Sequence, residues 1–253
     1  MAIDINYSET RGPNVDDFLS PQPTPSCFIP ICLYSFMANR PFLCEYLPWA
    51  ISKCEQPRII IGDYMERHNI MAFEALPEAE AVAKAERRGQ RIAREIEAVL
   101  NGFKADSNVQ VQSCREVIET AEAGRIISAI RDFASKNDCF NADMEQQIAL
   151  MLSNTKRLSR KTLENVNGEE MARLREYMIE EIAFFLALYQ EGYTTEIYPG
   201  RDMKILQKMA SARYRGFPYD FSERTHISVA VLLDSGTSYA RLDDNNGEGD
   251  PRE

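Results

Sequence analysis

Short apolar runs alternate with long helical patterns along this chain, and this alternation constrains the fold more than any other feature. The predicted strands are Phe28–Ser35, Arg58–Asp63, Val109–Cys114, Glu196–Tyr198 and Ile227–Leu233. The predicted helices are Pro41–Lys53, Pro77–Leu100, Glu116–Ser135, Met144–Leu152 and Glu169–Tyr189. Apolar strands that alternate with helices form a mainly parallel sheet covered on both faces. The sequence therefore predicts an α/β fold, with one domain of three layers.

The domain is expected to span residues 26–235, with a different composition on either side of it. Residues 1–25 are polar and proline-bearing, which predicts a disordered arm, and residues 236–253 predict a disordered acidic tail. No apolar run reaches the ~20 residues of a membrane span, and the N-terminus lacks the pattern of a secretory signal. Six cysteines are scattered without a CxxC pair, so we expect a cytoplasmic protein with reduced thiols.

Charge is distributed unevenly. The net charge of -10 argues against a nucleic-acid partner when it is taken alone. The helix after Pro77, however, gathers five cations within about a third of its circumference, beside an apolar arc. We call these residues the basic stripe: Lys84, Arg87, Arg88, Arg91 and Arg94. They could form a solvated face paired with nearby glutamates, or they could hold a polyphosphate backbone.

Three places along the chain carry residues that could do chemistry. Ser35 follows the first predicted strand, where α/β sheets line their ligand crevice, and there it is either a nucleophile or a turn serine. Tyr177 and Glu181 are one turn apart on a helix, so a phenol and a carboxylate placed together can relay protons. Alternatively, Tyr177 packs half-buried and Glu181 is a solvated charge. Tyr198 and Pro199 end another short strand.

Several common chemistries lack their sequence signatures. There is no P-loop, GxGxxG, HExxH or GxSxG motif. Only His68 and His226 are available as imidazole ligands, so neither a zinc site nor a Ser–His–acid triad is expected. ATP-dependent and nicotinamide chemistries are therefore disfavoured, and no metal or organic cofactor is expected.

The order of these motifs resembles that of the cyclodipeptide synthases. The matching residues are Ser35, the Tyr177-Met-Ile-Glu-Glu181 segment and Tyr198-Pro199. A second block, from Asp63 through Asn69, Met71 and Ala72 to the basic stripe, is similar to the family as well. The resemblance covers roughly Phe28 to Pro199. It implies a Rossmann-like domain similar to the catalytic domain of class I tyrosyl- and tryptophanyl-tRNA synthetases, acting without ATP.

The resemblance also implies roles for individual residues. Ser35 would accept an aminoacyl group from tRNA, Tyr177 and Glu181 would hold its amino group, and Tyr198 would support the serine. The basic stripe would hold the first aminoacyl-tRNA. The residues expected to contact the substrate are Asn39, Asp63, Asn69, Pro199 and Asp202. The product would be a cyclic dipeptide made from two aminoacyl-tRNAs.

The segment before the serine departs from the family, because Leu33-Tyr34-Ser35 stands where Gly-x-Ser is common. Such divergence is similar to the fungal, arginine-using branch, which implies an arginine in the product. A guanidinium needs a carboxylate partner, for which Glu180, Glu196 and Asp202 are candidates by position. Two alternatives remain: an aminoacyltransferase with a linear product, and a non-catalytic tRNA-binding module.

Overall fold

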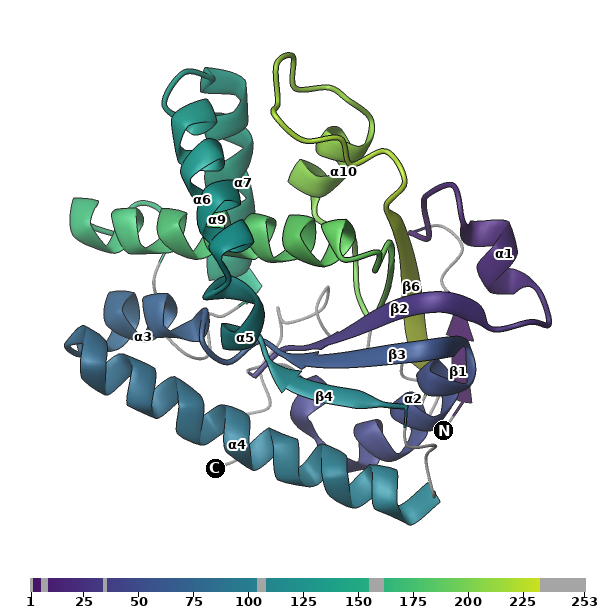
Figure 1. The fold of residues 1–253 in the computed structure, drawn as a ribbon. Coiled ribbons are helices and arrows are strands. Elements are labelled where there is room, and N and C mark those ends of the chain that lie inside the picture. Colours follow the sequence, from purple (N-terminus) through teal and green to yellow (C-terminus); the bar gives the residue numbers. More distant parts are fainter. Residues whose placement is uncertain (1, 6–8, 34–35, 104–107, 155–161, 233–253) are drawn as a thin grey trace.

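The computed structural model describes residues 2–5, 9–33, 36–103, 108–154 and 162–232. Their strands form one six-stranded sheet in the order β1-β6-β5-β2-β3-β4. β1 runs antiparallel to β6, and all other neighbouring strands are parallel (Figure 1). The strands are β1 (Ala2–Ile5), β2 (Thr24–Ile31), β3 (Cys54–Ile61), β4 (Gln110–Ser113), β5 (Thr195–Tyr198) and β6 (Thr225–Leu232). The predicted α/β class with a mainly parallel sheet is confirmed.

Helices connect the strands and begin at recognisable signals. They are α1 (Val15–Leu19), a 3-10 turn η1 (Phe36–Ala38), α2 (Arg40–Ser52), α3 (Glu66–Glu74), α4 (Glu78–Phe103), α5 (Arg115–Ile118), α6 (Ala121–Ala134), α7 (Asp138–Asn154), α9 (Gly168–Gln190) and α10 (Lys204–Ala210). Asn167 starts α9 with a capping box, in which its side chain and that of Glu170 each bond the other's backbone N–H. Pro41 lies in the first turn of α2, where no backbone N–H is needed.

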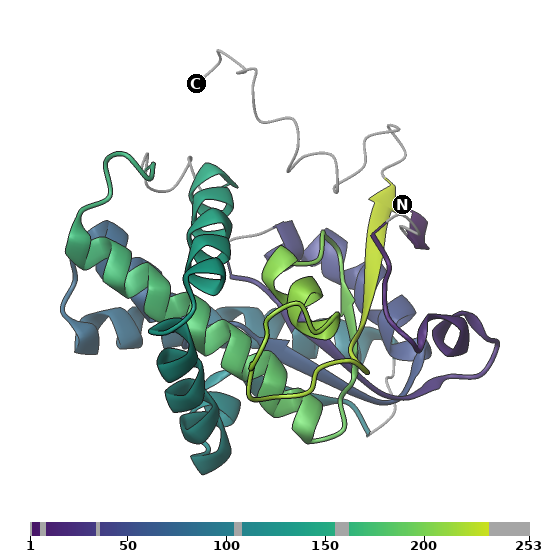
Figure 2. The same cartoon turned by 90° about the horizontal axis from the view of Figure 1, so that it is seen from above.

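The sheet separates two hydrophobic cores, and the alternation of residues along β3 shows why. Ile60 points into the core shared with α5, α6, α7 and α9. Ile59 and Ile61 point into the opposite core, shared with α2 and α4. Successive side chains of a strand face opposite sides, so a continuous isoleucine run suits a strand that is covered on both faces. Figures 1 and 2 show α9 crossing one face with α6 and α7 against it, while α4 lies along the other face.

The strand order reverses between β2 and β5. From β2 the chain builds outward through β3 and β4, whereas β5 pairs on the other side of β2 and is followed by β6. Ligands of open α/β sheets bind outside the carboxyl ends of the strands at such a switch point. The residues that follow Ile31 and the end of β5 at Tyr198 therefore mark the expected crevice.

Two sequence expectations need correction. Residues 2–5 and 9–25 do not form a disordered arm, because they contain β1, α1 and the buried side chain of Phe18. The helix expected over Glu116–Ser135 is broken at Thr120, whose hydroxyl accepts the N–H of Ala123 and starts α6. The expected tail at 236–253 lies outside the described residues. Within the described residues, no helix combines the length and apolar character needed to cross a membrane.

Candidate active site

The carboxyl ends of β2 and β5 bring two polar side chains together. Cys32 directly follows β2, and its sulfur lies 3.6 Å from the phenol oxygen of Tyr198 at the end of β5. Both side chains are half-buried. Burial raises the pKa of the Cys32 thiol to about 12, so the sulfur stays protonated at neutral pH. The predicted nucleophile Ser35 lies three residues further on, outside the described residues.

Helix α9 supplies the predicted tyrosine and glutamate. The phenol of Tyr177 donates to Oε1 of Glu181 over 3.3 Å, one helical turn away, as the spacing predicts. Burial raises the pKa of Glu181 to about 8, against a smaller lowering by the hydrogen bond from Tyr177. Burial and then the charge of Glu181 raise the pKa of Tyr177 well above its ordinary value of 10.0, which keeps it a hydrogen-bond donor. A carboxyl poised near neutral pH can take and return a proton.

These groups belong to one electrostatic cluster. The pKa of Tyr177 is raised by Glu181, Glu66, Cys32 and Tyr198, after burial. The pKa of Tyr198 is raised first by Cys32, then by burial, and then by Glu181. The switch-point residues and the α9 pair therefore lie within electrostatic reach of each other. We call Cys32, Glu66, Tyr177, Glu181 and Tyr198 the switch-point cluster.

A buried ion pair between α3 and α9 sets the orientation of both helices. The Nη1 atom of Arg67 donates to Oε2 of Glu180 over 2.8 Å, and Nε2 of His68 lies 3.1 Å from the same oxygen. Burial raises the pKa of Glu180, but the hydrogen bonds from His68 and Arg67 outweigh it, so this pKa falls below its usual value. Glu66 and Glu181 are the chain neighbours of these paired residues, and their position follows from the same contact.

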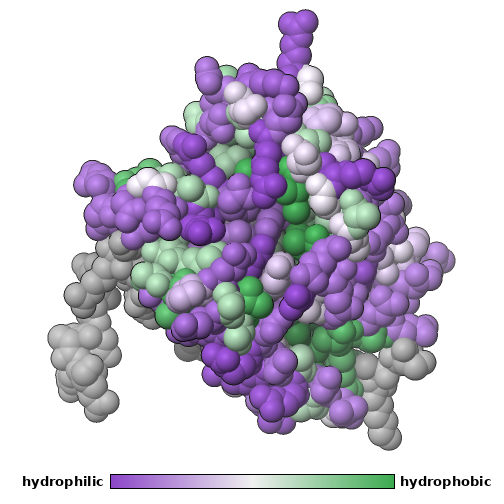
Figure 3. Space-filling model, turned by 60° about the vertical axis from the view of Figure 1, so that its left-hand side comes forward, coloured by the Kyte–Doolittle hydropathy of each residue, from purple (hydrophilic) through white to green (hydrophobic). Residues whose placement is uncertain are grey.

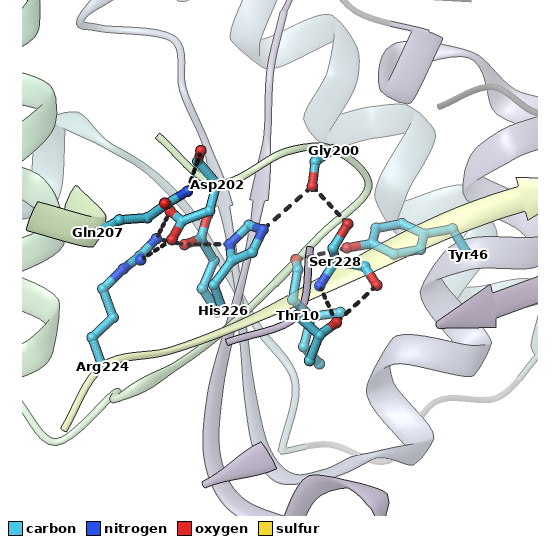
Figure 4. Close-up of polar contacts among 10 residues, drawn as sticks. Thr10, Tyr46, Gly200, Asp202, Gln207, Arg224, His226 and Ser228 are labelled. Carbon is cyan, nitrogen blue, oxygen red and sulfur yellow. Dashed lines mark hydrogen bonds and ion pairs between the residues drawn. The ribbon is translucent and has the colours of Figure 1, made fainter. Parts of the chain in front are cut away.

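A second buried network holds β5 and the loop after it (Figure 4). Arg224 donates to Oε2 of Glu196 over 2.5 Å and to Oδ2 of Asp202 over 2.9 Å. Nδ1 of His226 lies 3.2 Å from Oε2 of Glu196, and Nε2 of the same ring lies 3.3 Å from the carbonyl oxygen of Gly200. Both neighbours of this ring are hydrogen-bond acceptors. The network fixes the backbone on either side of Tyr198.

The same residues have the donor types of a metal site. Ligand atoms of Glu196, Asp202 and His226 lie within 4.8 Å of one another. The guanidinium of Arg224 already bonds both carboxylates, so this group carries its own cation. A cavity of about 440 Å³ reaches this network, since Asp202 and Arg224 line it, but it includes no member of the switch-point cluster.

The predicted arginine-binding carboxylates all have protein partners. Glu180 is bonded by Arg67, while Glu196 and Asp202 are bonded by Arg224. None of the three offers a free charge to a substrate guanidinium, so their proposed role is corrected. Sequence position alone could not show this, because the pairing cations come from distant segments.

The predicted substrate-binding residues lie in different environments. Asp63 is buried and accepts from the Ser113 hydroxyl and the Tyr64 N–H, so it joins the ends of β3 and β4. Asn69 is buried and donates to Glu66 over 3.0 Å. Pro199 is buried behind Tyr198, whereas Asn39 is exposed where α2 begins. Of this set, a hydrogen bond joins only Asn69 to the switch-point cluster within the described part of the chain.

The basic stripe lies on α4 as predicted. The apolar arc is buried at Ala81, Ala85, Ile92, Ile96 and Val99, which is the predicted core face. Lys84 and Arg88 lie beside Glu74, whereas Arg87, Arg91 and Arg94 are exposed. Figure 3 shows the side of the molecule where the left-hand ends of α3, α4 and α9 come forward. Its surface is mostly hydrophilic, with hydrophobic atoms visible in narrow hollows.

Sequence reasoning missed Cys32 and Glu66 as members of the site, and Arg224 as the support of β5. Cys32 lies inside the predicted strand Phe28–Ser35, and it reaches the site because β2 ends earlier, at Ile31. Glu66 lies three residues before Asn69, a spacing that places two side chains on one helical face, so it could have been noticed. Arg224 lies far along the chain from its acidic partners, and no pattern of spacing indicates that contact.

Comparisons with known proteins agree with the fold. No protein-family model and no curated protein matches the sequence. A CDPS, or cyclodipeptide synthase, from Fluoribacter dumoffii superposes with a TM-score of 0.72 at 16% identity, covering 90% of this chain and 96% of that one. The cyclodipeptide synthase from Candidatus Glomeribacter gigasporarum, bound to Phe-tRNAPhe, gives 0.56 at 16% identity, covering 85% and 90%.

A tyrosyl-tRNA synthetase from Archaeoglobus fulgidus, complexed with L-tyrosine, is more distant. Its TM-score is 0.50 at 9% identity, with 88% of this chain and 61% of that chain covered. Both kinds of neighbour superpose over most of this chain. The expected similarity to the tyrosyl-tRNA synthetase catalytic domain is therefore confirmed at the level of the fold, and the chain has the fold of the cyclodipeptide synthases.

Proposed function

We propose that this protein is a tRNA-dependent cyclodipeptide synthase. The observation that carries the proposal is the Tyr177–Glu181 pair, which lies with Tyr198 at the switch point of a fold shared with these enzymes. A half-buried carboxyl with a pKa of about 8, beside a neutral phenol, suits proton transfer to and from an amine.

In the proposed first step, the Ser35 hydroxyl attacks the ester carbonyl of an aminoacyl-tRNA. A new ester forms on the serine, and the tRNA leaves with its terminal hydroxyl restored. Glu181 and Tyr177 bind the α-amino group of the transferred residue. One ester replaces another, so the step needs positioning and proton transfer but no ATP.

In the proposed second step, the amino group of the bound residue attacks the ester of a second aminoacyl-tRNA. Glu181 accepts the proton that the attacking amine loses, and the second tRNA leaves. The free amine of the resulting dipeptide then attacks the serine ester, which closes the ring and frees Ser35. Two activated esters thus become two amide bonds, again without ATP, and Tyr198 supports the serine during the cycle.

The basic stripe is the proposed site for the first tRNA. Its exposed arginines offer charge to phosphates on a protein that is otherwise acidic. The neighbour from Candidatus Glomeribacter gigasporarum is bound to Phe-tRNAPhe, which shows that this fold can hold a charged tRNA. We place the activity in the cytoplasm, where charged tRNAs are available. Arginine is proposed as one of the two residues, from the resemblance to the arginine-using branch.

The products of a reaction with pre-charged mixed tRNAs and no ATP test this function. Mass spectrometry should find cyclic dipeptides with the wild type and none with Ser35→Ala, and their masses name the residues used. Linear products would replace the proposal with an aminoacyltransferase. If no product forms although tRNA binds in a salt-sensitive way, the protein is a tRNA-binding module instead.

A further inference from the structure

Asp63 is held by neutral donors where β3 and β4 end. The other buried carboxylates and the half-buried Glu181 fall into two groups. Glu180, Glu196 and Asp202 are each bonded by an arginine. Glu66 and Glu181 differ, because their only hydrogen-bond partners within the described residues are neutral: Asn69 for Glu66 and Tyr177 for Glu181. No lysine, arginine or histidine of that part of the chain forms an ion pair with either.

Two unneutralised carboxylates in one site are costly. Burial raises the pKa of Glu66 to about 7 and that of Glu181 to about 8, and Glu66 itself raises the pKa of Glu181. Glu180 and Glu196 are neutralised by arginines, whereas Glu66 and Glu181 lack a cation among the described residues, so a bound positive charge would be stabilised beside them. Glu181 accounts for one positive charge, the α-ammonium of the aminoacyl group.

Asn69 provides a second, independent sign of a missing donor. Its side chain is 8% exposed, and its amide nitrogen donates to Oε2 of Glu66 over 3.0 Å. The amide oxygen of Asn69 takes no part in that bond, and it is buried without a hydrogen-bond partner in the described part of the chain. Buried acceptors of this kind are usually satisfied. Glu66 and Asn69 thus present a carboxylate and an amide oxygen from adjacent turns of α3, both suited to a group with several N–H donors.

We propose that Glu66 and Asn69 bind the cationic side chain of the aminoacyl group whose α-ammonium lies at Glu181. A guanidinium fits best, because it carries five N–H donors and keeps its charge when buried. The inference rests on the proposed function, and it replaces the three carboxylates favoured from sequence position. Arg67 and Glu180 neutralise each other. Arg67 is therefore not available to pair with Glu66 or Glu181, and these two carboxylates are left for the ligand.

Calorimetry with small esters tests the assignment. L-arginine methyl ester and L-citrulline methyl ester share shape and α-amino group, but only the first carries a cationic side chain. The wild type should bind the arginine ester at least about tenfold more tightly than the citrulline ester. In Glu66→Gln that ratio should collapse toward one, while Glu78→Gln, an exposed substitution on α4, should retain it. Equal binding of both esters by the wild type overturns the assignment without any need for a variant to fold.

A folded Glu66→Gln variant that keeps the wild-type preference overturns it as well. The masses of the cyclic products separate this inference from the proposed function. If cyclic dipeptides form but never contain arginine or lysine, the Glu66 assignment fails and the synthase proposal stands. If the arginine ester is preferred but no cyclic dipeptide forms, the cationic pocket stands and the synthase proposal fails.

Discussion

At the scale of single residues, chain neighbours in this site have opposite electrostatic roles. Glu180 is ion-paired and its pKa is lowered, while the next residue, Glu181, has no cation partner among the described residues and a raised pKa. On α3, Arg67 supplies the pairing charge and Glu66 precedes it. Neighbouring side chains on a helix point about 100° apart, so one of each pair can stabilise the helix contact while the other faces the site.

The raised pKa of Glu181 predicts how stability depends on pH. In the folded state this carboxyl holds its proton up to a pKa of about 8, whereas the unfolded chain releases it near the ordinary value of 4.5. Between these two values the folded state binds more protons, so its contribution to stability falls as pH rises. Glu181→Gln resembles the protonated form, and it should stabilise the protein by about 1–3 kcal/mol at pH 8.5 with little effect at pH 5.

Thermal unfolding of the wild type and Glu181→Gln at the two pH values measures this difference. Glu78→Gln serves as the exposed control and should change stability equally little at both pH values. The same Glu181→Gln protein should lose cyclic dipeptide formation by about 10²-fold or more, because its amide cannot take a proton. Equal stability changes at pH 5 and pH 8.5 would show that Glu181 is not buried as described.

At the scale of elements, the long helices α2, α4 and α9 and the long strands could be predicted from the sequence, whereas α3 and α10 were not. The isoleucine run of β3 and the segregated faces of α4 are strong local patterns, and both lie where periodicity placed them. The short elements β1 and α1 could not be predicted, since β1 exists through its pairing with β6 at the far end of the chain. Tertiary contact rather than local propensity determines such segments.

Helix α4 gives a prediction about tRNA binding. Replacing Arg87, Arg91 and Arg94 with glutamine removes three exposed charges while leaving the buried face of α4 unchanged. Affinity for charged tRNA should fall by about tenfold or more at moderate salt. The slope of log affinity against log salt should lose roughly two units, at about 0.7–0.9 for each phosphate contact. Filter binding over a salt series measures both quantities.

A matched triple variant controls for net charge. Arg125, Arg213 and Arg215 are exposed arginines outside α4, and replacing them with glutamine changes the total charge by the same amount. This variant should keep the wild-type salt slope. If both triple variants weaken binding equally, the basic stripe is not the tRNA site and general charge explains the effect.

The Arg224 network gives a prediction about β5 and β6. Arg224→Met removes the only arginine bonded to Glu196 and Asp202 among the described residues and leaves both carboxylates buried. Breaking a buried pair in this way costs about 3–5 kcal/mol, which lowers the melting temperature by about 6–20 °C. The exposed substitution Arg213→Met should change it by little. A melting temperature within about 2 °C of wild type would contradict the network's structural role.

At the scale of the whole molecule, strand order creates the site. The sequence places β2 and β5 far apart, and no local pattern shows that they pair. Their pairing brings Cys32 against Tyr198, within electrostatic reach of Glu181 on α9. The roles of Tyr177, Glu181 and Tyr198 could be proposed from motif order. The absence of a cation beside Glu66 could not, because it depends on which distant segments pair with the other buried carboxylates.

The molecule also partitions its charge. Its net charge is -10, yet cations gather on α4, and the switch-point cluster holds two carboxylates without a protein cation among the described residues. This distribution suits a protein that binds a phosphate backbone at α4 and an amine at the switch-point cluster. It is consistent with the proposed use of aminoacyl-tRNA by an acidic protein.

Transfer of an aminoacyl group from tRNA to the protein is the central claim, and intact-protein mass spectrometry tests it most directly. The protein is mixed with one pre-charged aminoacyl-tRNA, without ATP, and quenched in acid within seconds. The account predicts a mass increase of one aminoacyl residue in the wild type and in Cys32→Ala, and none in Ser35→Ala. A mass increase that persists in Ser35→Ala, or that never appears in the wild type, would contradict it.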